Sequence, residues 1–214
     1  MAIGMIKAVI FDVDGVLLDS FEANLIFFQH LMTISGYRPP TRDEFPELFH
    51  LSMWDVIRTL TGLSSEEEIR KIWEVGRSRV GYDVGLLRMP EGAEETVKTL
   101  SLVYPLAIVT SRIRESVFES PQLAKLQPYF PVIVSFQDTV NRKPHPEPLL
   151  LAAKRLSVAP QESVYIGDVE NDLKAAKAAG MKVIIYSKNK FDEADFCTSS
   201  FEALPALIAI VISI

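Results

Sequence analysis

The chain contains almost no cysteine: Cys197 is the single one among 214 residues. One cysteine excludes an internal disulfide and is typical of a protein kept in a reducing compartment, so we expect a cytoplasmic location. Its neighbours Phe196 and Thr198 indicate a strand. We therefore interpret this thiol as a buried structural side chain rather than a catalytic nucleophile.

An excess of positive charge is also lacking, because 22 Lys and Arg face 28 Asp and Glu for a net charge of −6. This balance argues against a nucleic-acid partner, which needs a basic face, and it suits a protein that recruits metal cations. Met1–Phe11 has no basic region ahead of an apolar core, so it does not resemble a secretory signal. The apolar tail Leu204–Ile214 is too short to span a bilayer, and we expect a terminal helix there and no membrane partner.

Short apolar runs alternate with helix-like stretches over most of the chain. The runs that predict strands are Ile6–Phe11, Leu106–Thr110, Val132–Phe136, Ser163–Ile166 and Lys182–Tyr186. The stretches between them that predict helices are Glu94–Val103, Arg114–Leu126, Pro146–Leu156 and Glu170–Ala179. Strands that alternate with helices pair in parallel, with helices on both faces of the sheet. The pattern predicts a doubly wound α/β fold.

Residues 20–89 break this alternation, because they contain frequent helix starts and no convincing strand. Capping-box patterns stand at Thr41 with Glu44 and at Ser65 with Glu68. Ser52 can cap a helix that ends before Gly62, and Glu66–Arg79 has helical periodicity. We predict a small helical domain at 20–89, inserted into a core domain that comprises 1–19 and 90–214.

The first predicted strand ends in two carboxylates, Asp12 and Asp14, directly followed by Gly15. Ligands of doubly wound sheets collect at the carboxyl ends of the strands. Two neighbouring carboxylates at a buried strand end repel each other and need a cation or a shared proton. The same residue types also occur in simple turns, so this motif alone leaves a turn and a catalytic site equally open.

Three further strand ends carry polar residues. Thr110 ends one strand and is followed by Ser111 and Arg112, although a threonine there is also a routine helix cap. Lys143 lies in a proline-rich loop, where it either directs a charge at the acidic centre or remains on the surface. Asp168 and Asp172 follow another strand and share a face if a helix begins there, or they simply make an acidic helix start.

Taken together, these four strand ends resemble the motifs of the haloacid dehalogenase superfamily over nearly the whole chain. The helical insertion resembles the small α-helical cap class of that superfamily. Leu87–Gly92 and the Lys-Pro-His-Pro-Glu-Pro run at 143–148 resemble phosphoglycolate phosphatase-like members.

The resemblance implies a role for each matching residue. Asp12 is the expected nucleophile, which forms an aspartyl-phosphate, and Asp14 the general acid and then the general base. Mg²⁺ is the expected cofactor, bound by Asp12, Asp14 (through its backbone carbonyl) and Asp168, and supported by Asp172. Thr110 and Lys143 are the expected catalytic residues that hold the phosphoryl group. The expected substrate-binding residues are Gly15, Thr110, Ser111, Arg112 and Lys143.

The resemblance therefore implies a Mg²⁺-dependent phosphatase acting on a small phosphate ester. Phosphoglycolate, a sugar phosphate, a nucleotide and pyrophosphate all remain open as substrates, as do a monomer and a homodimer. Asp14 argues against a dehalogenase, whose leaving group needs no proton. A phosphomutase similar to β-phosphoglucomutase is the alternative, but Met53 and Asn24 stand where that enzyme has an arginine and a histidine. A non-catalytic binding module is disfavoured because the acidic residues and Lys143 are all present.

Overall fold

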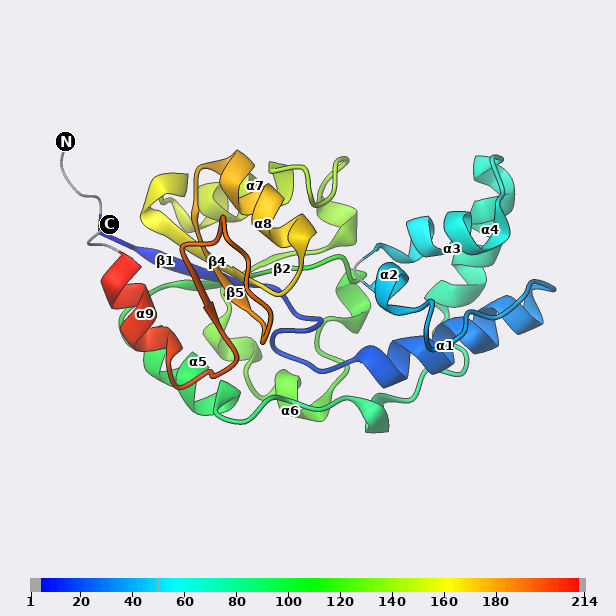
Figure 1. The fold of residues 1–214 in the computed structure, drawn as a ribbon, viewed down its shortest axis with the longest axis horizontal. Coiled ribbons are helices and arrows are strands. Elements are labelled where there is room, and N and C mark those ends of the chain that lie inside the picture. The colour runs from blue at the N-terminus through cyan, green and yellow to red at the C-terminus, as the bar shows by residue number, and fades with distance from the viewer. Residues whose placement is uncertain (1–4, 50, 212–214) are drawn as a thin grey trace. The chain divides into compact units, whose positions relative to one another are not determined.

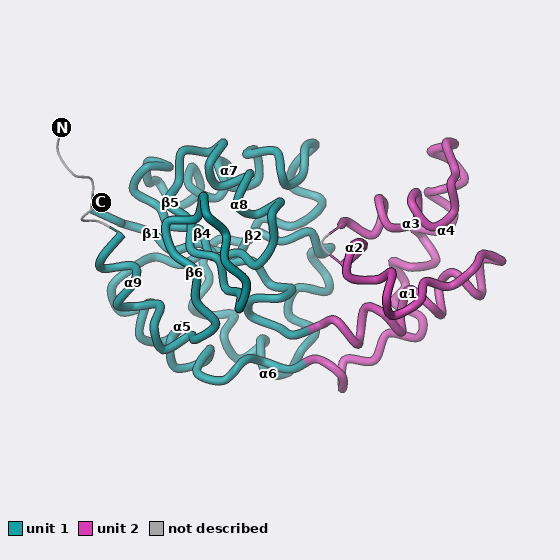
Figure 2. Tube along the Cα trace, in the orientation of Figure 1, with its two compact units in different colours: residues 1–19, 88–214 teal, residues 20–87 magenta. Residues whose placement is uncertain are grey.

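In the computed structural model, which describes residues 5–49 and 51–211, the chain divides into two compact units. Unit 1 combines the first segment, through Asp19, with residues from Arg88 onward, and unit 2 comprises Ser20–Leu87 (Figure 2). The chain leaves and re-enters unit 1 at Asp19 and Arg88. Their backbones exchange two hydrogen bonds, with N···O distances of 2.7 and 3.1 Å, so the insertion begins and ends at one place in the sheet unit.

Unit 1 is built on a parallel sheet with strand order β3-β2-β1-β4-β5-β6 (Figure 1). The strands are β1 (Ala8–Phe11), β2 (Leu106–Val109), β3 (Val132–Val134), β4 (Ser163–Gly167), β5 (Lys182–Tyr186) and β6 (Phe196–Thr198). Every residue of β1, β2 and β4 is buried, as befits strands covered by helices on both faces. The doubly wound α/β fold predicted from the sequence is confirmed.

Helices cover both faces of this sheet, with α7 and α8 on one face and α5 and α9 on the other (Figure 1). Their bounds are α5 (Ala93–Ser101), α7 (Glu147–Leu156), α8 (Glu170–Ala179) and α9 (Leu204–Val211). The last three residues of the predicted terminal helix, 212–214, lie outside the described residues. One core cluster joins α7 and α8 to side chains of the inner strands, among them Ile10 and Tyr165. Each of the helices covers apolar strand surface, which stabilises the sheet.

The single helix predicted over Arg114–Leu126 is wrong. This stretch forms the 3-10 helix η2 (Arg114–Ser116) and the short helix α6 (Pro121–Ala124), and the 3-10 helix η3 (Gln127–Tyr129) follows. Pro121 explains the break, because a proline disfavours helical backbone in the preceding residue, and Ser120 is extended with φ −70° and ψ 126°. Proline is favourable at the first position of a helix, so α6 begins there.

Two other predictions need smaller corrections. β3 ends at Val134, because Ser135 starts the 3-10 helix η4 (Phe136–Asp138) and makes a capping box with Asp138. Cys197 lies in β6 as predicted, but its side chain is half-buried rather than buried.

Unit 2 is helical, and the residues described in it contain no strand. It comprises α1 (Phe21–Ile34), α2 (Pro46–Phe49), α3 (Met53–Thr61), α4 (Glu66–Arg77) and the 3-10 helix η1 (Val84–Leu86). Ser52 caps α3 and Gly62 ends it in a left-handed conformation, as predicted, and Ser65 caps α4. Unit 2 has its own apolar cluster, which includes Phe27, Phe45, Ile57 and Ile69.

Within residues 5–49 and 51–211, none of the helices has the length and apolar character needed to cross a bilayer.

Candidate active site

The register of the sheet brings three of the predicted motifs to one edge. Phe11 pairs with Ile108 of β2 and with Ile166 of β4, so Asp12 lies level with Val109 and Gly167. Thr110 and Asp168 each come one residue later. The chain order of the strands reverses between β1 and β4, which is the point where ligands bind in doubly wound folds.

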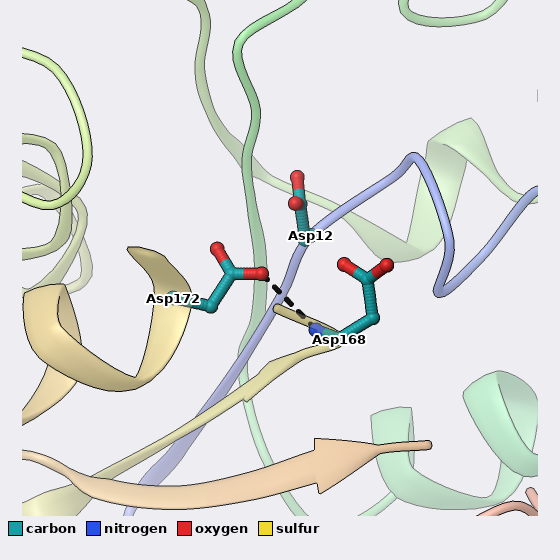
Figure 3. Close-up of side chains that lie close together, drawn as sticks. All are labelled: Asp12, Asp168 and Asp172. Carbon is teal, nitrogen blue, oxygen red and sulfur yellow. Dashed lines mark hydrogen bonds between the residues drawn. The ribbon is translucent and has the colours of Figure 1, made fainter. Parts of the chain in front are cut away.

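Three carboxylates gather at this point. Asp12 follows β1, Asp168 follows β4, and Asp172 projects from the first turn of α8 (Figure 3). One oxygen atom from each lies within 4.8 Å of the others. Asp172 Oδ2 accepts a hydrogen bond from the Asp168 backbone N–H at 3.0 Å, which ties the start of α8 to the end of β4.

Lys143 places one ammonium group among these acids. Its Nζ lies 2.7 Å from Asp12 Oδ2 and 2.7 Å from Asp172 Oδ1, and it donates to the Tyr165 hydroxyl at 3.0 Å. Only 8% of the lysine side chain is exposed, so this is no surface lysine. The two interpretations that the sequence left open for Lys143 are thereby resolved in favour of a charge directed at the acidic centre.

The electrostatics of the cluster follow from burial and from an excess of negative charge. Burial opposes the charged form of Lys143, but the charges of Asp12 and Asp172 outweigh it and raise the lysine pKa well above its usual value. Burial likewise favours a protonated Asp172, yet Lys143 and two backbone N–H groups lower its pKa. Burial, with the charge of Asp172, raises the pKa of both Asp12 and Asp168. One lysine therefore does not balance three acids.

The residues present fit a hard divalent cation. Three carboxylates supply the oxygen ligands that Mg²⁺ prefers, and the raised pKa values of Asp12 and Asp168 mark negative charge that the single lysine does not neutralise. A cation bound there offsets that charge.

Gly15 brings the backbone of the first loop close to Asp168. Its φ is +77°, and a Cβ atom built on it would lie 1.9 Å from Asp168 Oδ2. Its N–H donates to the Leu18 carbonyl at 2.8 Å, which closes a tight turn after Asp14. Only glycine fits this position without a displacement of Asp168.

Asp14 and Arg112 form a separate ion pair beside the triad. Arg112 Nε donates to Asp14 Oδ2 at 2.9 Å, and Nη2 donates to Asp14 Oδ1 at 2.7 Å. The remaining Nη1 donates to Glu119 Oε1 and to the Ser116 carbonyl. The sequence suggested Arg112 as a substrate-binding residue, but its guanidinium contacts these protein groups.

The other predicted residues occupy simpler positions. Thr110 is buried, and its hydroxyl accepts a hydrogen bond from the Arg112 backbone N–H at 3.1 Å. Ser111 is half-buried in the same loop. His145 is exposed and accepts from the Glu147 backbone N–H at the start of α7, which fits an ordinary helix-start residue.

Two residues of the site were missed in the sequence. Tyr165 stands in the middle of β4 with its hydroxyl 3.1 Å from Asp172 Oδ1, and Glu119 holds Arg112. The hydroxyl inside an otherwise apolar strand was an available signal for Tyr165. Nothing in the sequence around Glu119 connects it with the strand ends.

A buried acidic cluster with one lysine thus lies at the switch point of a doubly wound sheet, which is where α/β enzymes bind their ligands. Residues 9–186 match the family model described as haloacid dehalogenase-like hydrolase, and the chain belongs to this family. It is therefore a hydrolase, as the resemblance of its motifs implied.

Named relatives include two kinds of phosphatase. Over 180 residues the chain is 33% identical to the pyrophosphatase PpaX of Bacillus pumilus, covering 83% of this chain and 81% of the relative. A phosphoglycolate phosphatase of Shigella boydii is 35% identical over 121 residues, or 55% of this chain and 48% of the relative. Among solved structures, CbbY of Rhodobacter sphaeroides in complex with phosphate superposes with a TM-score of 0.80 at 25% identity, covering 94% of this chain and 96% of that one.

Proposed function

We propose that this hydrolase is a Mg²⁺-dependent phosphatase that acts on a small phosphorylated molecule through an aspartyl-phosphate on Asp12. The observation that supports it most is the position of Lys143 Nζ, 2.7 Å from both Asp12 and Asp172, with Asp168 in the same cluster. Phosphoryl transfer needs mainly positioning and the neutralisation of charge. The cluster supplies the positioning, and Lys143 together with a bound cation would supply the neutralisation. Residues 20–87 are, in this proposal, the cap domain of the enzyme.

In the first step an Asp12 oxygen attacks phosphorus, and the bond between phosphorus and the leaving oxygen breaks. Asp14 donates a proton to that leaving oxygen. In the second step Asp14 removes a proton from a water molecule, whose oxygen attacks the same phosphorus. Inorganic phosphate leaves and the Asp12 carboxylate is regenerated.

Positive charge and hydrogen bonds must hold the phosphoryl oxygens during both steps. Lys143 supplies an ammonium group that already contacts Asp12. Thr110, Ser111 and the backbone N–H groups of the two loops at 12–15 and 110–112 are the further donors in the proposal. Gly15 allows the first of these loops to turn back tightly.

Asp12, Asp168 and the backbone carbonyl of Asp14 would hold Mg²⁺, with Asp172 in support through Lys143. The cation supplies charge neutralisation, which lets a carboxylate approach a phosphate dianion.

The experiment is a phosphate-release screen of the purified protein, with and without Mg²⁺, over phosphoglycolate, sugar phosphates, nucleotides and pyrophosphate. We expect Mg²⁺-dependent release from at least one of them. The variant Asp12→Asn should lose release by at least about 10³-fold, because an amide cannot act as the nucleophile. Circular dichroism checks that this variant is folded.

Two results would contradict the proposal: no phosphate release from any compound, or an Asp12→Asn variant that retains most of the activity. Formation of glucose 6-phosphate from β-glucose 1-phosphate would point to the phosphomutase instead.

A further inference from the structure

Arg112 is a firmly held cation next to Asp14, the proposed proton carrier. Its side chain is only 7% exposed, and Asp14 next to it is 23% exposed. Two N–H groups of the guanidinium donate to the two oxygens of Asp14, at 2.9 and 2.7 Å. A bidentate pair of this kind fixes both the distance and the plane of the carboxylate.

The other side of the guanidinium is anchored in turn. Nη1 donates to Glu119 Oε1 at 2.8 Å and to the Ser116 carbonyl at 3.0 Å. Glu119 is itself 16% exposed, so this anchor is shielded from solvent. The backbone N–H of Arg112 donates to Thr110 Oγ1, which fixes the start of the loop after β2.

These contacts leave Arg112 poorly suited to bind a substrate by itself. At least four of the five N–H groups of the guanidinium are engaged, by Asp14, Glu119 and Ser116. A substrate phosphate could bind Arg112 only if it displaced a buried carboxylate, which would leave that charge without its partner.

We propose that Arg112 is a positioning residue that orients the Asp14 carboxylate for proton transfer, with Glu119 as its anchor. This inference depends on the proposed phosphatase function. General acid catalysis requires the donor within hydrogen-bond reach of the leaving oxygen, and the short Asp14 side chain gains its direction from this clamp. Loss of the clamp should slow formation of the aspartyl-phosphate more for an ester whose leaving oxygen needs a proton than for one whose leaving oxygen does not.

The test compares two aryl phosphates of similar shape. The leaving group of p-nitrophenyl phosphate needs little protonation, whereas that of phenyl phosphate needs more. For Arg112→Met we expect kcat/KM on phenyl phosphate, which covers only the steps up to the aspartyl-phosphate, to fall at least about tenfold more than kcat/KM on p-nitrophenyl phosphate. Arg112→Lys should recover part of this selective loss, because a lysine makes one of the two hydrogen bonds to Asp14.

Glu119→Gln tests the anchor and keeps Arg112 and Asp14 in place. It should lower the phenyl-to-nitrophenyl rate ratio in the same direction, by about threefold. This variant also carries the test if Arg112→Met does not fold, as judged by circular dichroism.

A double-mutant cycle with Asp14→Asn separates positioning from any other role. Asp14→Asn should itself show the selective loss, and adding Arg112→Met to it should cause no further selective loss, since the two changes act on one group. Arg114→Met is the matched control: this neighbouring arginine is 51% exposed and pairs with Asp138, so its removal should leave the rate ratio unchanged.

The inference is overturned if Arg112→Met and Glu119→Gln leave the rate ratio of the two esters unchanged. Equal losses on both esters with a raised KM would instead make Arg112 a direct phosphate ligand. Failure of the phosphatase proposal has a different signature, because the unmodified protein would then release phosphate neither from these two esters nor from any compound of the screen.

Discussion

Single residues near the strand ends contribute to the proposed site either through their charge or through the space that their side chains leave free. Lys143 contributes charge, because its ammonium reaches two acids from a loop far away in the sequence. Gly15 contributes shape, since the space that a side chain would need is filled by Asp168. The second contribution can be tested with one methyl group.

Gly15→Ala should damage the proposed metal site as well as the backbone. With φ at +77°, alanine costs about 1 to 2 kcal/mol of folding free energy. Its Cβ would also meet Asp168 Oδ2 at 1.9 Å, so the carboxylate must move. We expect a lower Tm and, in addition, a loss of Mg²⁺ affinity of at least about tenfold, measured by titration of the folded variant.

Gly36→Ala is the matched control for this change. Gly36 has φ +82°, so alanine there carries the same backbone cost, but no atom lies within 4 Å of the position that its Cβ would take. This variant should show a similar loss of stability with unchanged Mg²⁺ affinity and activity. Equal Mg²⁺ affinities of the two variants would contradict the role assigned to Gly15.

At the scale of elements, one carboxylate ties three segments of unit 1 together. Asp138 in η4 accepts hydrogen bonds from Ser135 after β3, from Arg155 of α7 and from Arg114 of η2. Burial by itself raises the pKa of Asp138, but the bonds from Ser135 and Arg155 and the charge of Arg114 outweigh it and lower the pKa to about 2. The ionised form is therefore the one that stabilises the fold.

Asp138→Asn should lower stability in a way that depends on pH. The folded-state pKa of Asp138 is about 2, below the ordinary value of 3.8, so its contribution is present above about pH 4 and is lost as pH falls toward 2. At pH 7 we expect the variant to lose about 1 to 2 kcal/mol of unfolding free energy. This is less than the full pKa shift implies, because solvent screens the interaction of Asp138 with the exposed Arg114. Urea unfolding at pH 7 and at pH 2.5 measures the difference.

The difference in free energy of unfolding between the unmodified protein and Asp138→Asn should be clearly smaller at pH 2.5 than at pH 7. Asp192→Asn is the control, because Asp192 is 88% exposed in its pair with Lys190 and should show almost no gap at either pH. A gap for Asp138→Asn that is the same at pH 7 and pH 2.5 would disprove the linkage.

Elements were predictable from the sequence where one physical signal dominated. The strands β1, β2, β4 and β5 stand out as apolar runs, and α8 has the predicted bounds Glu170–Ala179. Arg114–Leu126 was misjudged because its helical periodicity outweighed Pro121, which breaks the helix. Periodicity reports which residues face the core, and it does not report whether the backbone is continuous.

Some features of the candidate site could likewise be predicted from the sequence, and others could not. The positions of Asp12, Thr110 and Asp168 at one edge of the sheet could be predicted from the sequence, because a parallel sheet brings the carboxyl ends of its strands together. The partners of Arg112 could not be predicted in this way. Whether a guanidinium faces a ligand or a buried Glu119 depends on how the loop after β2 folds, and that follows from tertiary packing.

At the scale of the whole molecule, the proposed active site holds more negative than positive charge. Lys143 bonds Asp12 and Asp172, while Asp168 lies in the same cluster with burial and the charges of those acids raising its pKa. Such repulsion lowers the stability of the metal-free fold, and natural sequences retain costs of this kind where function requires them.

Asp168→Asn should therefore make the metal-free protein more stable and, at the same time, inactive. Burial and the charges of Asp172 and Asp12 raise the folded-state pKa of Asp168 above its unfolded value, so above about pH 4 folding must either bury the charge of Asp168 or take up a proton. The amide avoids this cost, and we expect a gain of about 1 to 2 kcal/mol in the free energy of unfolding at pH 7 in EDTA. For a chain of this size that corresponds to a rise in Tm of roughly 2 to 8 °C, measured by thermal unfolding.

Excess Mg²⁺ should raise the Tm of the unmodified protein and have much less effect on the variant, since a ligand stabilises only the fold that binds it. Asp195→Asn, which changes an acid of unit 1 paired with Lys182 away from the cluster, should keep the full response to Mg²⁺. An Asp168→Asn variant that is less stable than the unmodified protein in EDTA, or that keeps the Mg²⁺ response, would show that Asp168 is not the site of the unbalanced charge.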